Sequence, residues 1–207
     1  NEQDLFGMFS QQAKKTPTNL ALWVSGVEYS YEELLKCANR INDVLQDLEP
    51  GYCVLLMDRS VNIFASILAC LKLHFPYVPL NINDKPARKA ELLKILQPSL
   101  IMTDDDNIED AISVVKMADI DCYIVNTDRY SIKGPNSGKK SISSYAPVDH
   151  IEDLAYLLFT SGTTTVPKGV KVSHSNVLAY LQNAQQTFKP DDTDRFSQIH
   201  HLTTDYH

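Results

Sequence analysis

The stretch YCVLLMDRSVNIFASILACLKLHFPYVPL, residues 52–80, contains the unit that decides the fold. A short apolar strand at 52–57 is followed by a helical segment at 60–73 and by a second strand at 77–80. The same alternation then gives a helix at 86–96, a strand at 100–102, a helix at 107–117 and a strand at 122–125. Strands separated by helices pair in parallel and carry the helices on their faces, so the sequence predicts a doubly wound α/β fold.

Two amphipathic helices are expected upstream of this unit. Asp4 can cap the first, and Ser30 with Glu33 forms the pattern of a capping box at the start of the second. Strands are expected between them, at 20–24 and 27–29. The second helix has an apolar stripe whose positions advance by four and three residues: Leu34, Ala38, Ile41, Leu45 and Leu48.

The stretch FTSGTTTVPKGV, residues 159–170, follows an apolar, strand-like segment at 154–159 and precedes another. Its hydroxyl side chains, the backbone N–H groups near Gly162 and the positive charge of Lys168 suit a phosphate group. It is not a Walker P-loop, because Pro167 stands where that loop has a glycine before the lysine. A flexible Ser/Thr linker is the alternative, but the flanking strands and the stiff proline favour a phosphate site.

The same stretch resembles the phosphate-binding signature of the adenylate-forming superfamily, which includes acyl-CoA synthetases, firefly luciferase and the adenylation domains of nonribosomal peptide synthetases. The usual Thr-Ser-Gly-Thr-Thr-Gly-x-Pro-Lys-Gly is matched at 160–164 and 167–169, whereas Thr165 stands where the family has glycine. Residues 29–34 and 71–80 resemble two further elements of the family, although residues such as His74 replace small ones there. The Tyr-Val-Pro-Leu ending of the second element is closer to peptide synthetases, which points to an amino-acid substrate.

The resemblance implies a site for ATP, accompanied by Mg²⁺, in which Lys168 is the catalytic residue. The lysine and the loop hydroxyls hold the β and γ phosphates while a carboxylate attacks the α-phosphorus, which yields an acyl-adenylate and pyrophosphate. No metal ligand is expected from this chain. The nucleotide-binding residues implied are Thr160, Ser161, Gly162, Thr163, Thr164, Thr165, Lys168 and Gly169.

The resemblance also implies that the chain is the N-terminal part of the large domain of such an enzyme. We expect a first α/β subdomain at 1–150, with a surface connection from about residue 126, and the start of a second subdomain at 151–207. The partners implied are the C-terminal remainder and an acyl acceptor, either a carrier protein or CoA, and the chain alone is expected to be inactive. Because Thr165 departs from the signature, a non-catalytic nucleotide-binding or interaction module, degenerate or half of a split enzyme, is the alternative.

The segment 195–207 admits three interpretations besides a solvated stretch. Asp205 stands where the family's substrate pocket has an aspartate, so the resemblance implies that its carboxylate pairs with the α-ammonium group of an amino acid. The pattern of His200, His201 and Asp205 also resembles that of condensation-domain acyltransferases, which predicts His201 at an acyl-transfer centre. A metal site that includes His207 is disfavoured, because adjacent histidines on a strand point to opposite faces.

The composition narrows the possible partners. Lys and Arg total 19 against 26 Asp and Glu, a net charge of −7, which argues against nucleic acid and a membrane surface. The acidic run at 104–106 lacks the ligand spacing of a calcium loop and is expected to favour a helix N-terminus. Four widely separated cysteines are expected to be buried free thiols of a cytoplasmic protein: Cys37, Cys53, Cys70 and Cys122.

Overall fold

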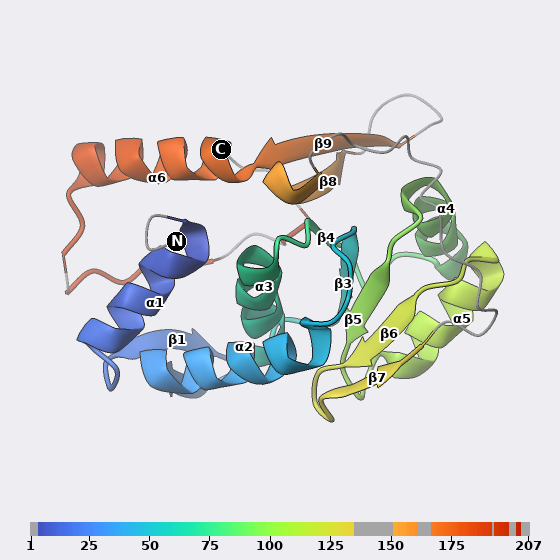
Figure 1. Cartoon of the computed structure of the whole chain (residues 1–207), viewed down its shortest axis with the longest axis horizontal. Helices are drawn as coiled ribbons and strands as arrows, with labels where there is room; N and C mark the ends of the chain where they lie inside the picture. The colour runs from blue at the N-terminus through green and yellow to red at the C-terminus, as the bar shows by residue number, and fades with distance from the viewer. Residues whose placement is uncertain (1–3, 135–150, 161–166, 192, 199–201, 204–207) are drawn as a thin grey trace.

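The computed structural model describes residues 4–134, 151–160, 167–191, 193–198 and 202–203, and Figure 1 shows how their elements are arranged. A seven-stranded sheet has the order β7-β6-β5-β3-β4-β8-β9. Its strands are β3 (Cys53–Leu56), β4 (Tyr77–Pro79), β5 (Leu100–Thr103), β6 (Tyr123–Asn126), β7 (Ser131–Lys133), β8 (Leu154–Thr160) and β9 (Lys168–Ser173).

The central strands of this sheet are parallel and the two edge strands are antiparallel to their neighbours. β3 pairs in parallel with β4 and β5, β5 pairs with β6, and β4 pairs with β8. β7 and β9 run antiparallel to β6 and β8. The chain passes from β3 to β4 on one side and returns to β5 on the other side of β3, so the strand order reverses at β3. This is the doubly wound α/β fold that the sequence predicts.

Helices cover both faces of the sheet (Figure 1). α2 (Tyr31–Leu45) and α3 (Val61–Leu73) pack on one face, whereas α4 (Pro86–Leu96) and α5 (Ile108–Ala118) pack on the other. The central strand β3 shows how the sequence specifies this arrangement. Cys53 and Leu55 join the apolar cluster of α2 and α3, and Val54 and Leu56 join that of α4 and α5. Apolar residues at successive positions are what a strand buried on both faces requires.

The N-terminal elements lie beside α2. α1 (Leu5–Lys15) is capped by Asp4, whose Oδ1 accepts a hydrogen bond from the N–H of Gly7 at 2.7 Å. β1 (Leu20–Val24) and β2 (Val27–Ser30) form a separate antiparallel pair. At the start of α2, the Ser30 hydroxyl accepts from the Glu33 N–H, and the Glu33 carboxylate accepts from the Ser30 N–H. The predicted capping box is therefore confirmed.

The predicted core positions are confirmed as well. The first four members of the predicted apolar stripe lie in α2 and are buried, whereas Leu48 lies beyond the end of this helix and is partly buried. The cysteines are free thiols; Cys37 is half-buried and the other three are buried. Burial raises the pKa of the Cys122 thiol to about 12, so this thiol stays protonated and behaves as a small apolar side chain.

The structure differs from the sequence prediction in three places. β7 lies within the segment predicted as an irregular connection, because an exposed edge strand of three residues has no readable periodicity. β9 begins at Lys168, so Lys168 and Gly169 belong to a strand rather than to the loop before it. The sequence predicts a helix after β9 whose apolar side chains pack on the sheet, but in α6 (His174–Phe188) these side chains are only partly buried: Val177, Leu178, Leu181 and Ala184.

The second part of the chain joins the first through the sheet. After the short 3-10 helix η1 (Ile151–Asp153), β8 adds directly to β4, with Tyr156 opposite Tyr77. The division into subdomains at 1–150 and 151–207 stays a prediction. Among the helices that the structure describes, none has both the length and the apolar character needed to cross a membrane.

Candidate functional site

The predicted phosphate-binding stretch connects the two strands of an antiparallel hairpin, β8 and β9. Phe159 pairs with Gly169 and Thr160 pairs with Lys168, so the last ladder pair directly flanks the hydroxyl-rich residues. Lys168 is exposed at the first position of β9. The central residues of the stretch lie outside the described part of the chain, so their role as nucleotide ligands stays a prediction: Ser161, Gly162, Thr163, Thr164 and Thr165.

β8 holds this hairpin to the core of the molecule. Its residues Ala155, Leu157 and Leu158 are buried. The ring centroids of Tyr156 and Tyr77 of β4 lie 5.3 Å apart, and burial raises the pKa of Tyr77 well above its ordinary value. The base of the hairpin is therefore a rigid strand, as a site requires if it is to stabilise charge without reorganising.

Two histidines connect the end of α3 to the start of α6. His74 follows α3 with a φ of 58°, in the left-handed region. Its Nδ1 lies 3.1 Å from the carbonyl oxygen of Glu152, and because a carbonyl only accepts, Nδ1 carries the proton. Its ring centroid lies 5.2 Å from that of His174. Burial, and after it the neighbouring His74, lowers the pKa of His174.

A lone histidine such as His174 is predicted to be a helix-capping or core residue, and it lies half-buried at the first position of α6. The cap itself is Ser173, whose hydroxyl accepts a hydrogen bond from the Asn176 N–H at 3.1 Å. The Asn176 side chain in turn accepts from the Ser173 N–H at 3.1 Å. α6 therefore begins immediately after β9, and its start is fixed by the same turn that ends the strand.

A cavity of about 310 Å³ opens at the carboxyl ends of β3 and β4. Doubly wound folds bind ligands at this point, where the strand order reverses. The Arg59 guanidinium donates to the carbonyl oxygen of Gln198 at 2.6 Å, which ties the segment 193–198 to the loop after β3. The residues that line the cavity include Asp58, Arg59, Asn81, Asn83, Leu202 and Thr203.

The remaining predicted site residues lie outside the described part of the chain: His200, His201, Asp205 and His207. The substrate contact of Asp205 and the acyl-transfer role of His201 therefore stay predictions. Within the described ranges, no group of three His, Cys, Asp or Glu residues gathers closely enough to hold a metal ion.

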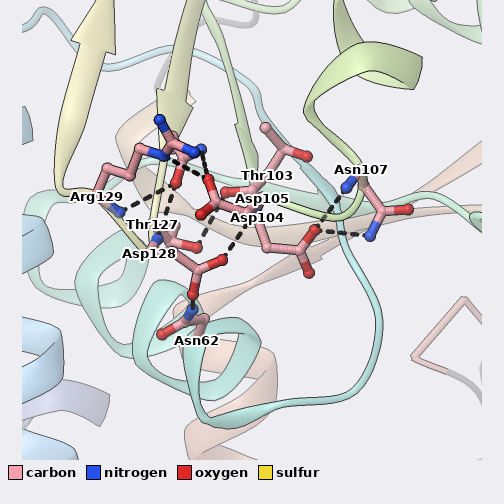
Figure 2. Close-up of polar contacts among 9 residues, drawn as sticks. Asn62, Thr103, Asp104, Asp105, Asn107, Thr127, Asp128 and Arg129 are labelled. Carbon is pink, nitrogen blue, oxygen red and sulfur yellow. Dashed lines mark hydrogen bonds and ion pairs between the residues drawn. The ribbon is translucent and has the colours of Figure 1, made fainter.

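A polar network links the carboxyl ends of β5 and β6 (Figure 2). Oδ1 of Asp105 accepts hydrogen bonds from Asn126 Nδ2 and from Arg129 Nε, each at 2.7 Å. Asp128 accepts from the Asp105 N–H at 2.8 Å and from Asn62 Nδ2 at 2.6 Å. The hydrogen bond from Arg129, supported by that from Asn126, holds the pKa of Asp105 below its ordinary value. The side chains of this network therefore supply hydrogen-bond partners for one another.

The acidic run at 104–106 has the structural role that the sequence predicts. Oδ1 of Asp104 accepts from the N–H of Asn107, the residue before α5, at 2.9 Å, and Glu109 and Asp110 lie in the first turn of that helix. The pairing of Asp105 with Arg129 was missed, although polar residues follow both strands. Parallel neighbouring strands have their carboxyl ends at the same edge of a sheet. This rule could have predicted that the residues after β5 and those after β6 lie close together.

Comparison with known proteins identifies the family. Residues 9–207 match the family described as AMP-binding enzyme. The chain belongs to this family. Gramicidin S synthase 2 of Brevibacillus brevis is 31% identical to this AMP-binding family member over 199 residues, which cover 95% of the chain and 4% of the synthase. The D-alanine–D-alanyl carrier protein ligase of Streptococcus equi subsp. equi is 30% identical over 161 residues, 75% of the chain and 29% of the ligase.

The solved structures agree with this assignment at the level of the fold. The AMPPNP-bound form of the nonribosomal peptide synthetase FmoA3 superposes with a TM-score of 0.73 at 22% identity, over 97% of the chain and 20% of that structure. The predicted resemblance to the adenylate-forming superfamily is confirmed by the family match and by the sequence relatives. The chain spans only a small part of the curated relatives that it matches, less than a third of the ligase and far less of the synthase.

Proposed function

We propose that this chain supplies the ATP-binding part of an enzyme that activates a carboxylic acid by adenylation, with an amino acid as the substrate. The observation that carries the proposal is the β8–β9 hairpin, which has an exposed lysine at the first position of its second strand, next to the family's phosphate signature. The AMPPNP complex of the structural relative FmoA3 supports ATP as the nucleotide.

In the proposed reaction, a carboxylate oxygen attacks the α-phosphorus of ATP, and the bond from this phosphorus to the bridging oxygen of pyrophosphate breaks. Negative charge accumulates on the departing pyrophosphate. Lys168 and the hydroxyls of Thr160, Ser161 and Thr163 to Thr165 would bind the β and γ phosphates and stabilise that charge. Gly162 and Gly169 belong to the same predicted set. Mg²⁺ would enter with ATP and neutralise part of the phosphate charge, held chiefly by phosphate oxygens and water.

The activities named for the relatives support an amino acid as the substrate. A peptide synthase and a D-alanyl carrier protein ligase are both among them. In this proposal Asp205 pairs with the α-ammonium group of the amino acid, a charge-assisted contact. The same relatives support a carrier protein as the acyl acceptor, with CoA as the alternative. Catalysis would then need the remainder of a longer enzyme as well as this chain.

A second candidate function is a nucleotide-binding module without catalytic activity, and Thr165 is the observation that favours it. If the glycine of the family signature serves a left-handed backbone or a close approach to phosphate, a β-branched residue at this position weakens binding. The acyltransferase prediction for His201 has no comparable support and stays a prediction.

Calorimetric titration of ATP and Mg²⁺ into the chain tests the proposal. We expect saturable binding that Lys168→Ala weakens about 10- to 100-fold, the effect of losing one charge-assisted hydrogen bond. The matched control is Lys171→Ala, which removes the same charge from the same strand. Lys171 is exposed and lies three positions further along β9, so it belongs to the opposite face. Equal binding by wild type and Lys168→Ala, with both folded, would contradict the assignment of Lys168.

A further inference from the structure

The backbone conformation of residue 169 does not require glycine. Gly169 lies at the second position of β9, opposite Phe159 in β8. Its φ lies outside the left-handed region that favours glycine. Glycine weakens the interior of a strand, because it lacks a side chain and loses more conformational freedom than other residues on folding. A strand position with ordinary φ therefore needs another reason to lack a side chain.

The space above Gly169 supplies that reason. A Cβ placed at this position would lie 3.2 Å from both Cδ atoms of Leu157 and 3.3 Å from its Cγ. Contacts this short require the neighbouring side chain to move by a few tenths of an ångström. Leu157 has no exposed surface and belongs to the apolar cluster that includes residues of α4 and α5. A side chain packed at crystal-like density cannot move without displacing others, so β9 would shift instead.

We propose that Gly169 is a positioning residue for Lys168: because it lacks a side chain, β9 packs closely over Leu157 and sets Lys168 opposite Thr160. The inference rests on the proposed function, in which Lys168 binds phosphate of ATP. Displacement of a binding group by about 1 Å through a remote change can cost about 100-fold in activity, so the smaller shift of β9 at Gly169, a few tenths of an ångström, should cost its neighbour about tenfold or less. The resemblance places Gly169 among the nucleotide-binding residues, and the inference gives it a different role: Gly169 acts through packing and does not touch the nucleotide.

Titration of Mg·ATP into four variants of the chain tests this inference. Gly169→Ala is expected to weaken binding about tenfold, and Leu157→Val alone to leave it within about twofold of wild type. Valine lacks the two Cδ atoms that a new Cβ would meet, so Gly169→Ala with Leu157→Val should regain most of the affinity. The matched control is Gly169→Ala with Leu158→Val. Leu158 is equally buried but alternates to the other face of β8, so this combination should bind as weakly as Gly169→Ala.

Three results would overturn the inference or assign the failure elsewhere. Wild-type affinity in a folded Gly169→Ala variant would overturn it. Weak binding that Leu157→Val does not restore would also overturn it, and would indicate direct approach of the nucleotide to the Gly169 backbone. In a Lys168→Ala background, Gly169→Ala should have no further effect on affinity, and an undiminished effect there would contradict action through Lys168.

The packing of Gly169 against Leu157 can be tested by stability measurements that need no ATP. If Lys168→Ala alone binds ATP as wild type does, the proposed function fails. The coupling between positions 157 and 169 is then measured by the urea midpoints of wild type, Gly169→Ala, Leu157→Val and the variant with both substitutions. Gly169→Ala should lower the midpoint, and Leu157→Val should recover part of that loss despite removing a buried methylene. Additive losses would contradict the packing contact.

Discussion

Two polar regions of the sheet invite the same functional interpretation but differ in the charged groups that they bring together. At the ends of β5 and β6, Asp105, Asp128 and Arg129 form a network with Asn62 and Asn126 (Figure 2). At the β8–β9 hairpin, Lys168 is exposed beside a hydroxyl-rich stretch that has no acidic residue. A dense cluster of polar side chains with both signs of charge stabilises itself, whereas a stretch of hydroxyls and backbone N–H groups beside an exposed lysine suits an anion.

This comparison predicts opposite effects of substitution in the two regions. Asn126→Ala should lower the free energy of unfolding by about 1–3 kcal/mol, because the buried amide accepts from two backbone N–H groups and donates to Asp105. ATP affinity should stay unchanged. Urea denaturation measures the first quantity and calorimetric titration the second.

The control for that substitution is Asn83→Ala. The Asn83 side chain is exposed, and its removal should change the free energy of unfolding by no more than about 0.5 kcal/mol. If Asn126→Ala instead weakened ATP binding while leaving stability unchanged, the network would be a ligand site and the contrast between the two regions would be wrong.

Thr165→Gly tests whether residue 165 limits ATP binding at the β8–β9 hairpin. If the family glycine serves a left-handed backbone, threonine there is strained by about 1–2 kcal/mol, so glycine should tighten ATP binding about fivefold or more. Titration of ATP into both forms measures the difference. Thr164→Gly is the matched control, because it removes a hydroxyl at a position where the family has threonine, and it should weaken binding. Equal affinities for wild type and Thr165→Gly would show that residue 165 does not limit binding.

A smaller effect is expected from pH at the His74–His174 contact. The pKa of His174 in the folded protein lies below its ordinary value of 6.5, chiefly through burial and then through His74, while Asp4 and Asp153 act in the opposite direction. The unfolded chain therefore binds the proton more readily, and the stability due to this group is complete above pH 6.5 and decreases as pH falls through that value.

Urea midpoints at pH 8 and pH 5.5 measure this dependence against a background of other titrating groups. His174→Asn removes the imidazole, so the decrease between the two pH values should be smaller in this variant than in wild type. A decrease of the same size in both would assign the pH dependence to groups other than His174.

The fold could be predicted from the sequence because its signals are local and regular. The consecutive apolar residues of β3 and the capping box at Ser30 each fix an element within a few residues. β7 could not be predicted, since Ser131–Lys133 is short and exposed and is a strand only because it pairs with β6. Lys168 was assigned to a loop for a similar reason, because its strand depends on the ladder with Thr160.

The candidate site could be predicted only where a motif marked it. The signature at 160–169 was found from its resemblance to the family's phosphate-binding signature, and the chain belongs to that family, whereas the role of the lysine stays a prediction. The contact between Gly169 and Leu157 was not predicted, because it depends on the diagonal packing of two strands. His74 was noticed only because it replaces a small residue of the family's element. Its contact with His174 was not predicted, because residue numbers 74 and 174 are 100 positions apart in the chain.

Lys168 is proposed to bind the β and γ phosphates of a nucleotide. The most direct measurement compares the affinities of wild type and Lys168→Ala for ATP and for AMP, by calorimetric titration in the same buffer. The account predicts that the substitution weakens ATP binding about 10- to 100-fold and leaves AMP binding within about twofold, because AMP lacks the phosphates that the lysine would contact. Equal losses for both nucleotides, or no loss for ATP, would contradict it.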